Sequence, residues 1–249
     1  AHSKIKSIPL YLDNMPKAQD MDFSQQKDNI NADILLVPAC PNRIFAANGK
    51  QSDYPSKLIL EKMGYRVKFL ADAESSCCGQ IYHSRCNPTQ QNKMTTNIEK
   101  KLIKTKTAII DNSSCSGFAQ DAGINLIDIN KFIVEKIDRA KLKNKYKKIA
   151  LHIDCSTAKH SFNQGYLELL QLCSVEIIIP EGIKCCGFAG DKGFTMPELN
   201  ASSLSQLSSQ IEGCEIGVTF NRSCQIGLTH HGKVEYISFV EIILNCFLD

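Results

Sequence analysis

The sequence predicts an α/β fold built from two pseudo-symmetric modules, each with a parallel sheet, and two observations support this prediction. Short apolar runs alternate with amphipathic helical patterns along the chain, which is typical of parallel strands joined by helical crossovers. The pattern also occurs twice, because four cysteine positions in the first half recur in the second half after 115, 108, 108 and 109 residues. A duplicated module explains both observations.

Shifts in composition divide the 249 residues into four expected segments. Residues 1–32 are polar and irregular, and they read as an entry arm or a linker from an upstream domain. Residues 33–138 form the first module and residues 149–249 the second. The lysine-rich residues 139–148 between them read as a solvated linker or, alternatively, as a basic patch for a partner.

The first module is expected to begin with a buried strand, because residues 34–39 are a continuous apolar run. A helix over residues 56–63 follows, since Pro55 suits its start and Gly64 its end. The remaining elements are a strand over residues 66–70, a helix that opens at Asn87 and Pro88, and a strand over residues 107–110. This order predicts βαβ units.

The second module repeats the order of the first. Its apolar runs and helical periodicities predict a strand over residues 149–153, a helix over 162–172, a strand over 175–179, a helix that opens at Pro197, and a strand over 216–220. Leu204, Leu207 and Ile211 share one face of the helix after Pro197, because they are spaced by three and four residues.

Eight of the twelve cysteines follow these strands in expected loops: Cys40, Cys77, Cys78 and Cys115 in the first module, and Cys155, Cys185, Cys186 and Cys224 in the second. In Rossmann-like folds, the carboxyl ends of the parallel strands meet at one edge of the sheet. Each module therefore gathers four sulfurs at one edge. The two edges are expected to face each other across a pseudo-twofold axis.

Each module contains two adjacent cysteines followed by a glycine, Gly79 or Gly187. Adjacent cysteines rarely bond to each other, because the geometry of a disulfide strains so small a ring. A glycine after them permits a positive φ and lets the backbone approach whatever the sulfurs hold. Four thiolates from three loops fit a [4Fe–4S] or [2Fe–2S] cluster or a tetrahedral zinc ion, and the ligand count does not choose among these.

Other cysteines and histidines have weaker claims to a site. Cys173 and Cys246 lie in apolar segments and read as core residues. His152 lies inside an apolar strand and also reads as a core residue. His83 and His160 lie in or just after the cysteine loops, so they are candidates to ligate a metal or to donate to a sulfur.

The composition argues against several classes of protein. A net charge of +3 is too mild for a nucleic-acid-binding protein. No run reaches the roughly 18 apolar residues of a membrane span, and the start of the chain lacks the pattern of a signal peptide. We therefore expect a cytoplasmic protein, free or peripheral at the inner face of the membrane. Twelve cysteines in such a chain indicate metal or redox chemistry rather than a disulfide framework.

The cysteine pattern resembles the CCG, or cysteine-rich, domain. This domain occurs as tandem copies in the heterodisulfide reductase B subunit and in the iron–sulfur subunits of glycolate, lactate and glycerol-3-phosphate dehydrogenases. The resemblance covers residues 34–232. Residues 185–194 and 221–227 look most like the C-terminal part of FAD-linked D-lactate dehydrogenase-type oxidoreductases. One departure from the pattern is that its last cysteine is replaced by Phe118 and by Gly227, so the fifth ligand of the noncubane [4Fe–4S] cluster of the reductase relatives is absent.

The resemblance implies an iron–sulfur domain that carries electrons from a flavin, reduced by a 2-hydroxy acid such as D-lactate, to a quinone or a cytochrome. It implies a [4Fe–4S] cluster on the motif cysteines, with amide donors near Gly79 and Gly187. FAD belongs to a missing upstream domain, and that domain and a ferredoxin-like domain are the implied partners. This chain alone is not expected to be an active enzyme. Two alternatives stay open: a structural module that binds zinc or no metal, and a thiol–disulfide redox module.

Overall fold

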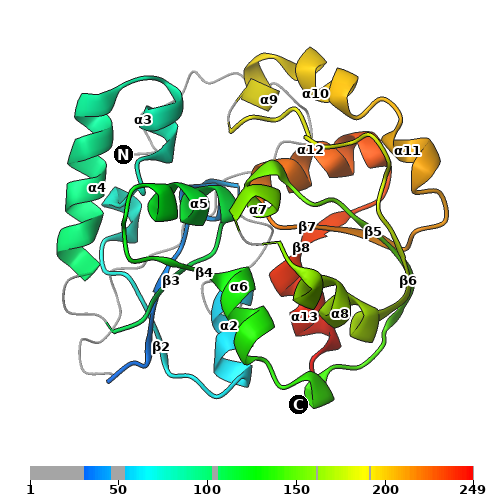
Figure 1. Ribbon diagram of the computed structural model, residues 1–249, viewed down its shortest axis with the longest axis horizontal. Helices are drawn as coiled ribbons and strands as arrows, with labels where there is room; N and C mark the ends of the chain where they lie inside the picture. Colours follow the sequence, from blue (N-terminus) through cyan, green and yellow to red (C-terminus); the bar gives the residue numbers. More distant parts are fainter. Residues whose placement is uncertain (1–30, 46–53, 103–105, 161, 191, 249) are drawn as a thin grey trace.

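The computed structural model describes residues 31–45, 54–102, 106–160, 162–190 and 192–248. Nearly all of the expected entry arm, residues 1–30, lies outside these ranges. The described residues form two four-stranded parallel sheets that lie side by side with helices packed around them (Figure 1). The predicted α/β class with two Rossmann-like modules is therefore confirmed.

The first sheet has the strand order β2-β1-β3-β4. Its strands are β1 (Ile34–Val37), β2 (Val67–Phe69), β3 (Ala108–Ile110) and β4 (Ile127–Asp128). All pairings are parallel, and Leu36 in the middle of β1 lies opposite Phe69 on one side and Ile109 on the other. The central strands are buried apolar runs, as the sequence predicts for a parallel sheet.

The second sheet repeats this order as β6-β5-β7-β8. Its strands are β5 (Tyr146–Leu151), β6 (Ser174–Ile178), β7 (Ile216–Thr219) and β8 (Tyr236–Ser238), and all are paired in parallel. Strand β5 begins at Tyr146, so the last three residues of the expected linker belong to the sheet. The short last strand of each sheet, β4 or β8, carries too few residues to give a pattern in the sequence.

Helices connect the strands in both modules. In the first module they are α1 (Cys40–Ile44), α2 (Pro55–Lys62), α3 (Gln80–Ser84), α4 (Pro88–Leu102), α5 (Ser113–Asp121) and α6 (Ile129–Lys136). In the second they are α7 (Cys155–His160), α8 (Gln164–Cys173), α9 (Lys192–Thr195), α10 (Pro197–Ser203), α11 (Leu207–Gln210), α12 (Arg222–Gly232) and α13 (Phe239–Cys246). Two 3₁₀ turns cover Ala73–Ser75 and Arg139–Lys141.

The structure also corrects the sequence-based prediction for one helix and for the placement of four cysteines. The single helix expected after Pro197 is two short helices, α10 and α11, because serines with weak helix propensity lie at the break. Four motif cysteines lie in the first turn of a helix rather than in a loop: Cys40, Cys115, Cys155 and Cys224. They lie three to five residues after the ends of their strands, so the edge of the sheet at which they lie is the predicted one.

The two modules share a hydrophobic core. Ile59 of α2, Phe132 of α6, Tyr166 of α8 and Phe239 of α13 are buried in the same apolar cluster. Helix α2 packs against α13, and α6 packs against α8. The modules are therefore held together by packing as well as by the chain that joins them.

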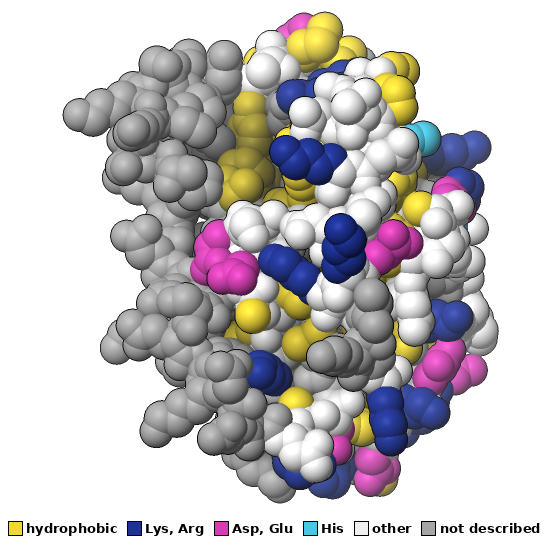
Figure 2. Space-filling view, turned by 90° about the vertical axis from the view of Figure 1, so that its left-hand side faces the viewer, with side chains coloured by type: hydrophobic (Ala, Val, Ile, Leu, Met, Phe, Trp, Pro, Cys, Tyr) yellow, Lys and Arg dark blue, Asp and Glu magenta, His cyan; other side chains and the backbone are white. Residues whose placement is uncertain are grey.

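The surface carries charges of both signs. Figure 2 shows basic and acidic side chains interspersed on one face of the molecule, with small apolar areas between them. Among the described residues, no helix is both long enough and apolar enough to cross a membrane.

Candidate metal centres

The first set of motif cysteines lies where three neighbouring strands end. Cys40 is the first residue of α1, directly after β1. Cys77 and Cys78 lie in the loop after β2, and Cys115 lies in the first turn of α5, after β3. Because β2, β1 and β3 are adjacent and parallel, these thiols converge at one edge of the sheet.

The thiols of the first set lie close enough to shift one another's pKa. Cys40 and Cys77, Cys77 and Cys78, and Cys78 and Cys115 are the pairs that interact in this way. The backbone amide of Gly79 donates to Cys77 Sγ at 3.4 Å. Cys78 and Cys115 are buried, and Cys40 and Cys77 are partly exposed.

The second set repeats this placement. Cys155 is the first residue of α7, after β5, and Cys185 and Cys186 lie in the loop after β6. Cys224 lies in the first turn of α12, and its Sγ is 2.9 Å from Cys186 Sγ. The amide of Gly187 donates to Cys185 Sγ at 3.3 Å, as the amide of Gly79 does in the first module.

Neighbouring thiols shift one another's ionisation. A hydrogen bond with Cys185 is the main cause that raises the pKa of Cys155, and burial raises it further. Hydrogen bonds with Cys185 and Cys224 raise the pKa of Cys186. Hydrogen bonds with Cys155 and Cys186 lower the pKa of Cys185. In the first set, the hydrogen bond with Cys77 and then burial raise the pKa of Cys40. Protons are thus held between the sulfurs, and a metal must displace them to bind.

The two glycines of the vicinal motifs sit in tight cradles. Gly187 has φ +71°, and a Cβ added to it would lie 2.6 Å from the carbonyl oxygen of Leu199. Gly79 has φ +103°, and an added Cβ would lie 3.0 Å from Thr95 Cγ2. Only glycine fits both the backbone conformation and the space. The predicted close approach of backbone amides to the sulfurs is therefore present in the structure.

The positions of the missing fifth cysteine are filled in different ways. In the first module the Phe118 ring lies 5.4 Å from that of His83 and packs beside Gly79. In the second module Gly227 leaves room for Asn200, whose buried side chain donates through Nδ2 to the carbonyl oxygen of Cys186. A Cβ on Gly227 would lie 2.5 Å from Asn200 Nδ2.

A buried histidine lies beside the second set. His152 is 1% exposed, its Nε2 has no hydrogen-bond partner among the described residues, and its ring interacts electrostatically with Cys185. Burial lowers its pKa to about 4, so the ring is neutral at pH 7. A neutral imidazole N–H beside a thiolate is available to donate to a sulfur. His152 is buried, as its prediction as a core residue requires.

The chemistry of the donor sets suits an iron–sulfur cluster. Each set brings four thiols from three neighbouring strands to one edge of its sheet, and one glycine amide donates to a sulfur of each set. In an iron–sulfur cluster the thiolates bind different iron atoms and amides donate to the sulfurs.

A polar network joins the two sets across the module boundary. Ser113 donates to both carboxylate oxygens of Asp154, at 3.0 and 3.2 Å, and Ser156 donates to the carbonyl oxygen of Ser113 at 2.8 Å. Asn221 donates to Ser114. These residues adjoin Cys115, Cys155 and Cys224 in the sequence, so the network fixes the two sets relative to each other.

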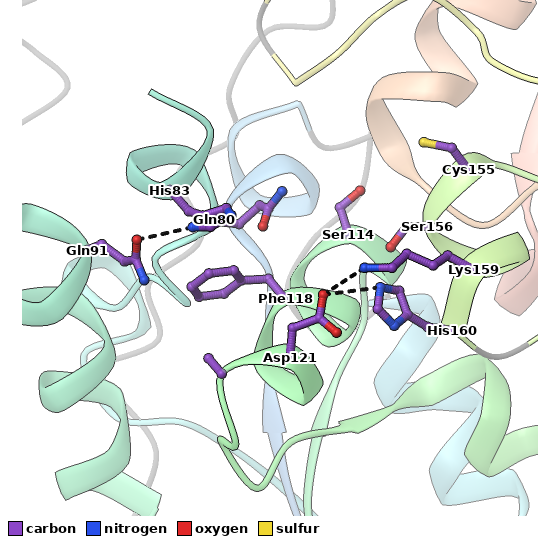
Figure 3. Close-up of a pocket in the computed structure, with 11 residues that line it drawn as sticks. Gln80, His83, Gln91, Ser114, Phe118, Asp121, Cys155, Ser156, Lys159 and His160 are labelled. Carbon is purple, nitrogen blue, oxygen red and sulfur yellow. Dashed lines mark hydrogen bonds and ion pairs between the residues drawn. The ribbon is translucent and has the colours of Figure 1, made fainter. Parts of the chain in front are cut away.

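A cavity of about 450 Å³ opens between the modules next to Cys155 (Figure 3). Asp121 on its wall pairs with Lys159 at 2.9 Å and with His160 at 3.6 Å, and so links α5 to α7. His83 faces Gln91, with its Nδ1 3.3 Å from the amide oxygen. His83 and His160 therefore line the cavity, and no hydrogen bond joins either of these described side chains to a sulfur.

Several side chains near the sulfurs could not be predicted from the sequence. Arg43 donates to Cys40 Sγ at 3.4 Å, and Asn200 holds the backbone of Cys186. Both are single polar residues outside any motif. Cys173 and Cys246, read as core residues, are buried, and interaction with Cys246 raises the pKa of Cys173.

Comparisons with known proteins agree with the cysteine pattern. The family model of the cysteine-rich domain called CCG matches residues 149–229. The glycolate oxidase iron-sulfur subunit of Escherichia coli (strain K12) is 22% identical over 237 residues, which cover 84% of this chain and 57% of that protein. Lactate utilization protein A 1 of Bacillus mycoides (strain KBAB4) is 20% identical over 215 residues, 75% of this chain and 87% of that protein.

This chain thus spans little more than half of the first of these relatives. Among solved structures, the aspartate racemase of Picrophilus torridus is 9% identical and covers 85% of this chain and 90% of its own. Its TM-score of 0.37 is too low to indicate a shared fold. The match over residues 149–229 confirms, for the second module, the resemblance to the CCG domain that the cysteine spacing predicts.

Proposed function

We propose that this chain, whose residues 149–229 match the CCG cysteine-rich domain, is an iron–sulfur electron-transfer unit. The observation that carries the proposal is the duplicated thiol set: four cysteines at the carboxyl ends of three adjacent strands, present in each module. The glycine amides at 3.4 and 3.3 Å from Cys77 and Cys185 support it, since iron–sulfur ligands accept such bonds. So does the similarity to an iron–sulfur subunit.

In this proposal each module holds one [4Fe–4S] cluster. The ligands are Cys40, Cys77, Cys78 and Cys115 in the first module, and Cys155, Cys185, Cys186 and Cys224 in the second. The cluster supplies the capacity to take up and release one electron. The chain supplies the thiolates and the amides of Gly79 and Gly187, and in the first module it also supplies a setting in which no ligand cysteine is fully exposed.

The electrons come, in this account, from a flavin in a partner domain that oxidises a small 2-hydroxy acid. The similarity to a glycolate oxidase subunit and to a lactate utilization protein supports this class of substrate. We propose D-lactate as the substrate, an FAD domain and a ferredoxin-like domain as partners, and a quinone or a cytochrome as acceptor. This chain alone is not active, and it works at the cytoplasmic side of the membrane or in the cytoplasm.

A second candidate function is thiol–disulfide exchange. It is favoured by the 2.9 Å approach of Cys186 Sγ to Cys224 Sγ, which places two thiols in position to form a bond on oxidation. All described cysteines are free in the structure. Alkylation of protein that contains no iron, with and without prior reduction, would reveal a pair that cycles.

The experiment that tests the proposed function is a count of iron, acid-labile sulfide and zinc in the full chain purified without oxygen. Visible absorption and EPR spectra complete it. Iron and sulfide in equal amounts support the cluster. Zinc in place of iron, or no metal after anaerobic reconstitution, would reject it in favour of a structural module or of thiol chemistry.

A further inference from the structure

One cation in the described part of the chain donates a hydrogen bond to a motif sulfur. Arg43 Nη2 lies 3.4 Å from Cys40 Sγ. The same guanidinium is held in place on two sides, by Nε to the carbonyl oxygen of Pro38 at 3.0 Å and by Nη2 to that of Ser76 at 3.1 Å. The fork therefore points at the sulfur in a fixed geometry, between the loop that carries Cys40 and the loop that carries Cys77.

The second module has no equivalent. Arg43 is three residues after Cys40, and three residues after Cys155 stands Ala158. Arg222, close in sequence to Cys224, is directed elsewhere: its Nε donates to the carbonyl oxygen of Phe45 at 2.6 Å and its Nη1 to Gln225 at 2.8 Å. Among the described residues, no arginine, lysine or histidine donates to a sulfur of the second set.

The two sets also differ in their exposure to water. In the second set Cys155 and Cys185 are exposed, whereas no cysteine of the first set is fully exposed. Reduction adds a negative charge to a cluster, and burial away from water disfavours that charge. By burial alone, the first site would therefore be the harder one to reduce.

We propose that Arg43 raises the reduction potential of the first-module cluster and so offsets the burial of that site. A cation in contact with a ligand sulfur stabilises the negative charge that reduction adds. Arg43 thus stabilises the reduced first cluster, as water stabilises the reduced second cluster. With the two sites brought closer in potential in this way, bound clusters would exchange an electron without a large uphill step. This inference rests on the proposed function.

The test is a redox titration of anaerobically reconstituted protein in the Cys186→Ser background, in which the first-module cluster is the one retained. Adding Arg43→Gln removes the cation. The midpoint potential should fall by at least about 59 mV, which corresponds to a tenfold change in the one-electron equilibrium constant. Arg43→Lys keeps a cation but loses the fork, so its midpoint should lie between the two.

The matched control is Arg66→Gln. Arg66 belongs to the same module and carries the same charge, but it pairs with Asp33 at 2.7 Å at the amino end of β2, away from the sulfurs. Its removal should leave the midpoint unchanged. A fall of equal size in both variants would show a general charge effect and would overturn the proposal.

Two further outcomes also decide. An unmoved midpoint in Arg43→Gln with intact iron would reject the tuning role. If Arg43→Gln does not retain its cluster, the titration uses Arg43→Met, which is neutral and of similar length. Loss of iron in both variants would assign Arg43 a purely structural role and reject the tuning role. Absence of iron in the unsubstituted chain would reject the proposed function itself, whereas iron with an unmoved midpoint rejects only this inference.

Discussion

Asn221 Nδ2 donates to Asn112 Oδ1 at 3.5 Å, and these two residues occupy equivalent positions 109 residues apart. Each follows the third strand of its module and precedes the helix that carries the last motif cysteine. Equivalent positions meet each other where a pseudo-twofold axis passes between two copies of a module. The two cysteine sets thus face a common boundary, as expected from the repeat.

The close approach of α5 to α7 at this boundary depends on Gly117. A Cβ there would lie 2.6 Å from His160 Cδ2 and 2.7 Å from Ser156 Oγ. Gly117→Val should therefore lower the free energy of unfolding by about 1–3 kcal/mol through overpacking. Urea denaturation measures it. Ala158→Val, at an exposed position of α7, is the control and should cost less than about 0.7 kcal/mol; equal costs would argue against a tight boundary.

Replacement of Gly187 is expected to cost more stability than its positive φ alone would explain. Gly187→Ala adds a contact of 2.6 Å to the Leu199 carbonyl oxygen to the strain of a positive φ. Gly190→Ala has a similar φ of +77° with no atom within 4 Å, so it should cost only the strain, about 1–2 kcal/mol. Thermal unfolding should rank Gly187→Ala as the less stable variant. Equal melting temperatures would show that the contact is relieved at no cost.

Asn200 and Gly227 should act as one unit. Asn200→Ala leaves the carbonyl oxygen of Cys186 without its donor and should cost about 1–3 kcal/mol. Gly227→Ala expels the same amide group, so the double variant should be little worse than either single variant. Denaturant unfolding of the three proteins tests this coupling, and additive losses would contradict it.

A control for this pair exists in the first module. Asn92 precedes Asn200 by 108 residues, the offset of the vicinal cysteines, but it is exposed. Asn92→Ala should therefore change the free energy of unfolding by less than about 0.5 kcal/mol.

Removal of metal should destabilise the chain. The thiols of each site come from separate loops, so a bound cluster ties these loops together in the native state and not in the unfolded chain. An iron chelator under reducing conditions should lower the melting temperature of the anaerobic protein. The Cys78→Ser, Cys186→Ser double variant should not respond, and an equal response there would place the metal elsewhere.

Much of the architecture was accessible from the sequence. The buried strands give continuous apolar runs, and parallel strands bring residues at their carboxyl ends together. The eight motif cysteines and their repeat could therefore be placed at two sheet edges from the sequence alone. Pro55 and Pro88 each begin a helix as predicted, because proline suits a first turn.

Other features leave no periodic trace in the sequence. The contacts of Arg43 and Asn200 depend on loops that meet only in the folded chain, and a single polar residue is typical of any surface. The shared core also escaped prediction, because apolar residues of α2 and α13 give the same helical pattern whichever module they face. The break after α10 depends on a short serine-rich stretch, in which propensity differences are small.

The most direct test of the central claim is the iron content of three anaerobically purified proteins: the unsubstituted chain, Cys78→Ser and Cys186→Ser. Two clusters on two thiol sets predict about four iron atoms per module in the unsubstituted chain and loss of about half of the iron in each variant. Circular dichroism should show that both variants stay folded. Unchanged iron in either variant, or zinc in place of iron in the unsubstituted chain, would contradict the assignment of these cysteines as cluster ligands.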